Sequence, residues 1–274
     1  MGIIIIGVVL AVIGVILWVV KGKKESKSIH LELTDTSTVG EVLENYNSLS
    51  PTVGDGNFTH FCELKGKAHA DSPIQSSLSE IECVYYSSKV IRKYEEREWK
   101  TDSEGKRQQH WQKKSDVVSE NKQWANNFGI KDETGFVEVD PAKAELHSEK
   151  VHSSFEKGEP SLGSALSAIV GKFSLGSGTV DGNDYRLIGY EKVEHAIKQG
   201  ENLYVLGDAN DRDGSLRVSK PNTNKPFIIS TKSEDELVSN LGSSVKRLKI
   251  SAYIFWGLGA IAVIVGILKT LQII

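Results

Sequence analysis

The residues best suited to metal chemistry are His60, Cys62, Cys83 and His110, because each side chain can ligate zinc. The close ligand spacing of finger-type zinc sites is missing, and both cysteines fall in segments with the β-branched and aromatic composition of strands. Two cysteines also exclude a disulfide-rich scaffold, a four-cysteine zinc site or a RING within this sequence. We therefore interpret the cysteines as small buried core residues, and we predict no metal site and no cofactor.

Two further motifs resemble binding loops only in part. Asp208-x-Asn210 begins like a calcium loop, but its glycine stands at the seventh position instead of the sixth and no glutamate stands at the twelfth, so we interpret it as a hairpin turn. Gly176-Ser-Gly178 lacks the third glycine of a phosphate-binding loop. The sequence contains no Gly-x-Ser-x-Gly and no His-Glu-x-x-His. We predict no catalytic residue and no intrinsic enzymatic activity.

The segment from Lys93 to Lys114 mixes acidic and basic residues around Trp99, His110 and Trp111. One interpretation is a nucleic-acid surface, and the other is a solvated hairpin that turns at Asp102-Ser-Glu-Gly105 and pairs its charges across the strands. The signs alternate too evenly for a phosphate track. Between the two apolar ends of the chain, 32 basic residues also face 36 acidic ones. We favour the hairpin and expect no nucleic-acid partner.

The 274 residues are 39% hydrophobic and 25% charged, with a mean hydropathy of −0.25, but the apolar residues are concentrated at the two ends. Residues 2–20 and 250–268 are each 19 residues long and carry no charge before Lys269. As helices each would be roughly 28 Å long, close to the ~30 Å hydrocarbon core of a bilayer. We predict an integral membrane protein with two transmembrane helices, the first an uncleaved anchor because the basic cluster follows it.

Charges beside the two predicted spans indicate their orientation. Lys269 and the terminal amine lie on the far side of the spans. Seven basic residues lie on the loop side: Lys21, Lys23, Lys24, Lys27, Lys246, Arg247 and Lys249. This asymmetry favours a cytoplasmic loop with both termini outside.

Small residues recur on one face of each span and predict helix packing in lipid: Gly7, Ala11 and Gly14 on the first, and Gly259, Ala262 and Gly266 on the second. One pairing of these faces would close a single molecule. A surplus face, or the loop domain, would then join copies into the homo-oligomer that we expect. The alternative is a self-contained helical hairpin.

The pattern between the spans predicts an α+β fold. Residues 21–56 read as a linker and a short amphipathic helix with a capping box at Thr38-Val-Gly-Glu41. Residues 57–232 form the β-rich domain, in which 160–183 is a Gly/Ser-rich segment, either a mobile loop or a lipid-touching amphipathic patch. Residues 233–249 form a second amphipathic helix that runs into the second span.

Six segments resemble, in order, motifs of the GIDE domain, also called BAM for "beside a membrane": Leu64-Lys-Gly-Lys67, Cys83-Val-Tyr-Tyr86, Tyr94 to Gly105, Asp132-x-Thr-Gly135, Leu203 to Gly207 and Pro226 to Leu237. The resemblance covers roughly Thr38 to Leu268 and includes the two-span layout. The family is named from the mitochondrial membrane ubiquitin ligase MULAN, in which a RING follows the second span.

This resemblance, without cysteines for a RING, implies a RING-less prokaryotic-type member. Such a member is expected to be a membrane-anchored sensing or scaffold module that binds a protein partner or ligand beside the lipid bilayer in stress or antiviral response. One alternative is an E3 ubiquitin-ligase family component that lacks its own RING. Another is an oligomeric effector that perturbs membranes.

Overall fold

The structure, a computed structural model, describes residues 2–101, 105–158 and 185–271, which form two compact units. Unit 1 comprises Met1–Gly66, Asp132–His147 and Asn202–Ile274, and unit 2 comprises Lys67–Lys131 and Ser148–Glu201. The β-rich residues 57–232 thus contribute to both units. The Gly/Ser-rich segment 160–183 lies outside the described residues, as does most of the turn expected at Asp102-Ser-Glu-Gly105.

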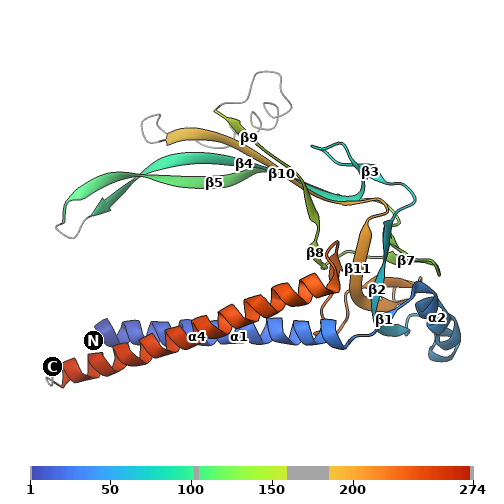
Figure 1. The fold of residues 1–274 in the computed structure, drawn as a ribbon, viewed down its shortest axis with the longest axis horizontal. Helices are drawn as coiled ribbons and strands as arrows, with labels where there is room; N and C mark the ends of the chain where they lie inside the picture. The colour runs from blue at the N-terminus through green and yellow to red at the C-terminus, as the bar shows by residue number, and fades with distance from the viewer. Residues whose placement is uncertain (1, 102–104, 159–184, 272–274) are drawn as a thin grey trace. The chain divides into compact units, whose positions relative to one another are not determined.

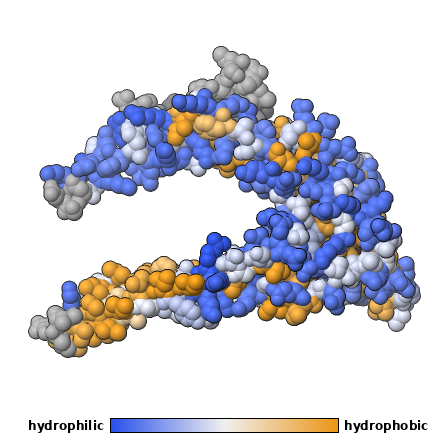
Figure 2. All heavy atoms as spheres, viewed as in Figure 1, coloured by the Kyte–Doolittle hydropathy of each residue, from blue (hydrophilic) through white to orange (hydrophobic). Residues whose placement is uncertain are grey.

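Three helices belong to unit 1: α1 (Gly2–Leu33), α2 (Val39–Val53) and α4 (Glu234–Thr270). The helices α1 and α4 pack antiparallel along each other, and both chain ends lie at the same end of the pair (Figure 1). Both are long and apolar enough to cross a membrane, and hydrophobic residues dominate their outer halves (Figure 2). The fold is α+β, as predicted, with a β-rich region between two apolar helices.

The helix α1 is longer than predicted, because residues 21–33, expected to be part of a polar linker, continue it without a break. Lys21 and Glu25 form an ion pair one helical turn apart, which supports the helix locally. Leu31 in the last turn is fully buried. The tertiary packing of this leucine therefore stabilises the end of the helix. The polar sequence of residues 21–33 does not by itself predict a helix there.

Both predicted capping boxes are present. The Thr38 hydroxyl accepts from the Glu41 amide at 3.2 Å, and the Glu41 carboxylate accepts from the Thr38 amide at 2.8 Å, which starts α2. The same reciprocal pair between Ser233 and Glu236 starts α4. From there α4 runs as one helix into the apolar segment, as the periodicity predicts. The helix α2 includes Pro51 in its last turn.

The sheet of unit 1 is built around β11, most of which is buried. Here β11 pairs antiparallel with β12 and β13, β12 pairs parallel with β7, β13 pairs parallel with β8, and β1 pairs parallel with β2. The strands of this sheet are β1 (Thr36–Ser37), β2 (Thr59–His69), β7 (Phe136–Val139), β8 (Glu145–His147), β11 (Asn202–Asn210), β12 (Arg217–Ser219) and β13 (Ile228–Ser230). The end of β2, from Lys67, continues into unit 2.

Unit 2 contains a sheet in which β4 pairs with β10 on one side and with β3 and β5 on the other, and β10 pairs with β9. The strands of this sheet are β3 (Ile74–Gln75), β4 (Glu82–Thr101), β5 (Arg107–Trp124), β9 (Glu149–Lys157) and β10 (Tyr185–Lys198). Unit 2 also contains β6 (Gly129–Lys131), which pairs antiparallel with the end of β2. The long hairpin of β4 and β5 is the one predicted from the charge pattern. Its charges do pair across the strands, as between Lys114 and Glu96 at 2.6 Å.

The core of unit 1 joins the two long helices to the sheet. Leu31 of α1 and Leu237 of α4 are buried in one cluster with Tyr204 and Leu206 of β11 and Ile228 of β13. Fully burying such a side chain stabilises a fold by about 1.5–3 kcal/mol. The helix pair and the sheet are therefore parts of one packed body within unit 1.

Candidate functional site

The predicted helix-packing residues lie along the contact between α1 and α4, where four of them are buried: Gly7, Gly14, Gly259 and Gly266. Ala11 and Ala262 are half-buried. A β-carbon added at Gly7 would stand 2.8 Å from the carbonyl oxygen of Gly259, so a side chain there would push the backbones apart. These small-residue faces are thus occupied within one chain. Association between copies through the helices would have to use other faces.

Three aromatic side chains gather where the apolar halves of the two helices give way to the charged halves. The ring of Trp18 lies 5.9 Å from that of Tyr253 and 5.4 Å from that of Trp256, and the Lys21 ammonium lies 4.9 Å from the Trp18 ring centroid. Tryptophan and tyrosine are enriched at bilayer–water interfaces. This cluster therefore stands at the boundary between the apolar and the charged halves of the helix pair.

A cavity of about 910 Å³ opens directly beyond this aromatic cluster, beside α1. Its wall begins with Val19 in the last turn of the apolar segment. Glu145 is its one acidic lining residue among the described part of the chain. Five lysines and a histidine also line it: Lys23, Lys27, Lys143, Lys220, Lys225 and His30. A second cavity of about 440 Å³ shares Lys23, Lys27 and Glu145 and adds Lys24, Lys232 and His147. We call the larger one the basic cavity.

The acid of the basic cavity is already engaged. One carboxylate oxygen of Glu145 lies 2.5 Å from the Lys27 ammonium and 3.1 Å from the Nε2 atom of His147. The hydrogen bond from His147, together with Lys27, lowers the pKa of Glu145 to about 2. The carboxylate therefore stays ionised and neutralises one neighbouring cation, while the other lysines keep the cavity positive.

A buried carboxylate ties α4 to the sheet. Glu63 on β2 is fully buried and accepts hydrogen bonds from the Tyr204 hydroxyl at 2.7 Å and the Thr36 hydroxyl at 2.6 Å. Lys65 lies 2.9 Å from Glu63 and 2.8 Å from Glu234 in the first turn of α4. Burial and the Glu63 carboxylate both raise the pKa of Tyr204, which remains a donor. The network links β1, β2, β11 and α4.

The Asp132-x-Thr-Gly135 motif has a structural role. One carboxylate oxygen of Asp132 accepts from the Val39 amide at 2.8 Å, and the other accepts from the Thr134 amide at 2.7 Å and the Gly135 amide at 3.0 Å. The Thr134 hydroxyl accepts from the Gly40 amide at 2.7 Å. Although burial opposes it, these hydrogen bonds lower the pKa of Asp132. The motif therefore caps α2, whose first amides have no partner inside the helix.

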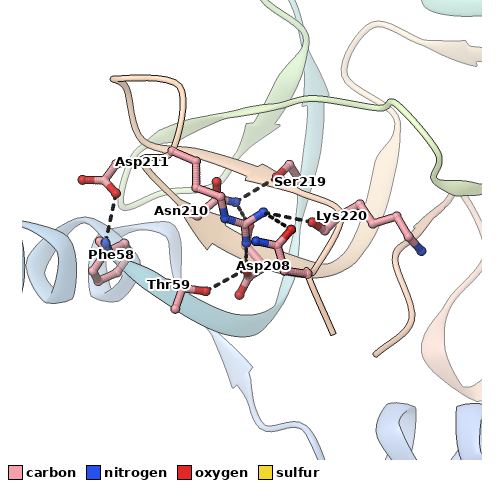
Figure 3. A network of polar contacts seen from close by, with 9 residues as sticks. Phe58, Thr59, Asp208, Asn210, Asp211, Ser219 and Lys220 are labelled. Carbon is pink, nitrogen blue, oxygen red and sulfur yellow. Dashed lines mark hydrogen bonds and ion pairs between the residues drawn. The ribbon is translucent and has the colours of Figure 1, made fainter. Parts of the chain in front are cut away.

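Asp208-x-Asn210, which begins like a calcium loop, is part of the hairpin of β11 and β12, as expected. Figure 3 shows Asp208 within a network of polar contacts in which its carboxylate accepts from the Thr59 hydroxyl at 2.7 Å and pairs with Arg212. The Asn210 amide donates to the Ser219 hydroxyl at 2.8 Å. Because the Arg212 guanidinium neutralises the Asp208 carboxylate, we interpret this network as a structural one.

The two cysteines lie in different units. Cys62 on β2 and Cys83 on β4 are free and buried, as expected, and burial raises the pKa of Cys62 to about 12 and that of Cys83 to about 11. A thiol that stays protonated at neutral pH is a poor nucleophile and metal ligand. His60 is half-buried and His110 is exposed. Among the described residues, no group of three or more His, Cys, Asp or Glu side chains is placed to hold a metal ion.

One face of the β4–β5 hairpin in unit 2 combines aromatic rings with arginines. The guanidinium groups of Arg97 and Arg186 lie 4.8 Å and 4.0 Å from the centroid of the Trp111 ring. Trp99, two residues along β4 from Arg97 and thus on the same face, is 60% exposed. Tryptophan and arginine are enriched among the residues that dominate binding at protein interfaces. We call these four residues the Trp–Arg face.

Sequence reasoning did not find the basic cavity. In the sequence, Lys23 and Lys27 indicate only charge beside a predicted membrane span, and Lys220 and Lys225 follow a turn almost 200 residues later. Charge periodicity cannot join segments so far apart. A signal was nevertheless present, since basic residues cluster both after the first apolar segment and at 220–225.

Comparison with known proteins identifies relatives for this arrangement. The family model GIDE, described as an E3 ubiquitin ligase, matches residues 95–266. Two curated proteins of Arabidopsis thaliana are similar: the E3 ubiquitin-protein ligase SP1, 35% identical over 88 residues, and the E3 ubiquitin-protein ligase SPL1, 31% identical over 137 residues. These alignments cover 31% and 49% of this chain, which spans only 25% and 37% of the two relatives. No solved structure matches.

Proposed function

The chain belongs to the GIDE family, and from that premise we propose that it is a membrane-anchored scaffold that carries a protein-binding surface. Its sequence motifs also support kinship with the mitochondrial membrane ligase for which the family is named. The surface that we assign to the partner is the Trp–Arg face. The chain itself supplies anchoring and recognition, and the partner supplies any chemistry.

The observation that carries this proposal is the continuity of the two long helices. Each runs without a break from an apolar segment into the buried core of unit 1, where Leu31 and Leu237 pack against the sheet. A helix that spans a bilayer and then packs rigidly holds its sheet at the membrane surface. Two such helices restrict the movement of the sheet relative to the bilayer, whereas a single flexible linker would allow it to move freely.

The Trp–Arg face supports a protein partner more than a nucleic acid. Its arginines have a carboxylate beside them, since Glu95 is the cross-strand partner of Arg186 and lies two residues from Arg97 along β4. A phosphate backbone would be repelled by that carboxylate. An exposed tryptophan beside arginines and acids suits the mixed polar and apolar surface of a protein.

Photo-crosslinking in native membranes tests the scaffold function. With benzoylphenylalanine in place of Trp99, we expect one discrete crosslinked protein, because the probe replaces the exposed aromatic side chain of the proposed interface. The matched control is Lys100, the next residue of β4, which points to the opposite face of the sheet. A lipid-facing probe at Val12, which is exposed on α1, reports association between copies through the helices.

The outcomes of this experiment differ for each function. A protein adduct at Trp99 and none at Lys100 supports the scaffold. A second copy of the chain, captured at Val12, identifies the homo-oligomer that we propose as a further state of the scaffold. Equal adducts at Trp99 and Lys100, or nucleic acid captured at Trp99, would contradict the assigned surface.

We also propose that the domain lies in the cytoplasm, with both chain ends outside. The support is the seven basic residues on the domain side of the apolar segments against Lys269 on the other. A cysteine introduced at Lys106 should then resist an impermeant thiol reagent in intact cells and react after permeabilisation. A cysteine at Thr270 should react in intact cells.

Lys106 and Thr270 are a matched pair because both side chains are exposed, so a difference in labelling reports the side of the membrane. The native Cys62 and Cys83 are buried and should contribute little background. The opposite labelling pattern, with Lys106→Cys reactive and Thr270→Cys protected in intact cells, would refute the orientation.

A second candidate function, favoured by the names of the two plant relatives, is a component of a ubiquitin ligase. A RING holds two zinc ions with about eight Cys and His ligands. The two cysteines of this sequence lie buried in separate units, so in this function the zinc-binding part would come from outside these 274 residues. A crosslinked partner at Trp99 that itself binds zinc and promotes ubiquitin transfer would establish this role.

A further inference from the structure

The basic cavity has positive charge that the protein itself leaves unmatched. Its acid, Glu145, is engaged by Lys27 at 2.5 Å. Within the described residues, Lys23, Lys143 and Lys220 make no ion pair, although each lines the cavity. Ammonium groups held close together repel one another, so a site of this kind is stabilised when an anion enters it.

The position of the cavity along α1 indicates where such an anion would come from. Lys23 follows the end of the apolar segment at Val20 by three residues, and Lys27 follows it by seven. At about 1.5 Å per residue these lysines stand ~4.5 and ~10 Å beyond the apolar segment. The headgroup layer of a bilayer extends roughly 5–8 Å beyond the hydrocarbon on each side. The two lysines therefore bracket the depth of the phosphate groups.

The lining of the basic cavity changes from apolar to basic along α1, as the binding of a lipid with an apolar chain and an anionic headgroup would require. Val19, in the last apolar turn of α1, forms one end of the cavity wall, and the lysines form the rest. The aromatic cluster of Trp18, Tyr253 and Trp256 lies at this same level. An acyl chain beside the apolar helix would thus lead directly to a phosphate among ammonium groups.

We propose that the basic cavity binds the phosphate headgroup of an anionic phospholipid from the surrounding leaflet. This site rests on the proposed function only in requiring that α1 and α4 span the bilayer. A phosphodiester carries one negative charge and oxygen acceptors for several lysine ammonium groups. A zwitterionic phospholipid has the same phosphate but adds a cation that the cavity lysines repel. The site therefore selects for net negative charge.

The test uses the purified full chain in a mild non-ionic detergent. Dioleoylphosphatidylglycerol should raise the thermal unfolding midpoint and remain bound through purification, whereas dioleoylphosphatidylcholine should do neither. The Lys23→Gln, Lys220→Gln double variant should bind phosphatidylglycerol about 25-fold more weakly, since each lysine near an anionic headgroup contributes about fivefold. The Lys23→Arg, Lys220→Arg variant, which keeps both charges, should recover most of the affinity.

The matched control is Lys246→Gln, Lys249→Gln. These two lysines are exposed on α4 close to its apolar segment but do not line the basic cavity. Screened surface charges of this kind should change the affinity less than about threefold. A loss equal to that of the cavity variant would overturn the proposal, because it would reflect general surface charge.

Two further outcomes separate this site from its alternatives. Equal stabilisation by inorganic phosphate and by phosphatidylglycerol would overturn the lipid assignment in favour of a free-anion site. Alkaline extraction of membranes measures the anchoring separately. A chain that resists extraction yet shows no preference for phosphatidylglycerol would overturn the lipid site alone, whereas a chain that is extracted would overturn the proposed function.

Discussion

Replacing Glu194 with glutamine should lower the free energy of unfolding of the full chain by about 3 kcal/mol, because a buried carboxylate that satisfies several donors would lose its charge and one acceptor. Glu194 on β10 is fully buried. It accepts from the Ser76 hydroxyl and the Leu78 and Ser79 amides at 2.9 Å each, and also from the Ser77 and Ser79 hydroxyls. A glutamine amide group would point its own N–H bonds at some of these donors.

Glu191 on the same strand provides the matched control. It forms a partly exposed ion pair with Lys93 at 3.0 Å, so Glu191→Gln should cost less than about 1 kcal/mol. Guanidinium unfolding of both variants in mild detergent measures the difference. Amide hydrogen exchange localises it, since the Leu78 and Ser79 amides should exchange faster only in Glu194→Gln. Similar losses of unfolding free energy in the two variants would show that the buried Glu194 contributes no more to stability than a surface ion pair.

The pH dependence follows from the same contacts. Although burial opposes it, the hydrogen bonds from Ser79, Leu78 and Ser76 lower the pKa of Glu194 below its ordinary value of 4.5. A carboxyl with a lowered folded-state pKa stabilises the fold fully above the unfolded value, and this contribution is lost as the pH falls through the folded value. The stability difference between the native chain and Glu194→Gln should therefore be constant at neutral pH and shrink below pH 4.5.

The features of this fold that could be predicted are those that depend on residues close together in the sequence. The capping boxes at Thr38 and Ser233 join residues three positions apart, and the structure contains both. The β4–β5 hairpin followed from alternating charges on neighbouring strands, which pair as expected. The apolar segments needed only a count of uncharged residues. In each case the interacting residues are close in the chain, so spacing alone carries the information.

The features that escaped prediction depend on residues far apart in the chain. Glu194 meets the serines of 76–79 across more than 110 positions, and Glu63 meets Tyr204 across 141. A single acidic residue within a strand looks like an exposed polar position until its donors are placed around it. The polar helix turns of residues 21–33 escaped for the same reason, because what holds them is the burial of Leu31 against strands more than 170 residues later.

Replacing Leu31 with alanine should lower the free energy of unfolding of unit 1 by about 3 kcal/mol, within the ~2–5 kcal/mol range of buried leucine truncations. Leu31 is fully buried and belongs to the cluster that contains Tyr204, Ile228 and Leu237. The cluster joins both long helices to the sheet, so few neighbours can relax into the space that the smaller side chain leaves. Chemical unfolding in mild detergent, followed by tyrosine fluorescence, measures the loss.

The matched control stands two residues away in the same helix. Leu33 is 77% exposed, so Leu33→Ala should change stability by less than about 0.5 kcal/mol. Hydrogen exchange should also distinguish the two variants, because only Leu31→Ala opens β11 and β13. Equal effects of the two substitutions would mean that α1 is not packed on the sheet.

The consequence for function can be measured separately from stability. The contact between Gly7 and Gly259 lies more than twenty residues along α1 from Leu31, so the helix pair should still form and resist alkaline extraction in Leu31→Ala. What should change is the hold of the helices on the sheet, seen as faster exchange of β11 in a chain that is still anchored. If Leu31→Ala also released the chain from the membrane, anchoring would depend on the packing of Leu31. The apolar half of α1 would then not be sufficient to anchor the chain, contrary to our expectation.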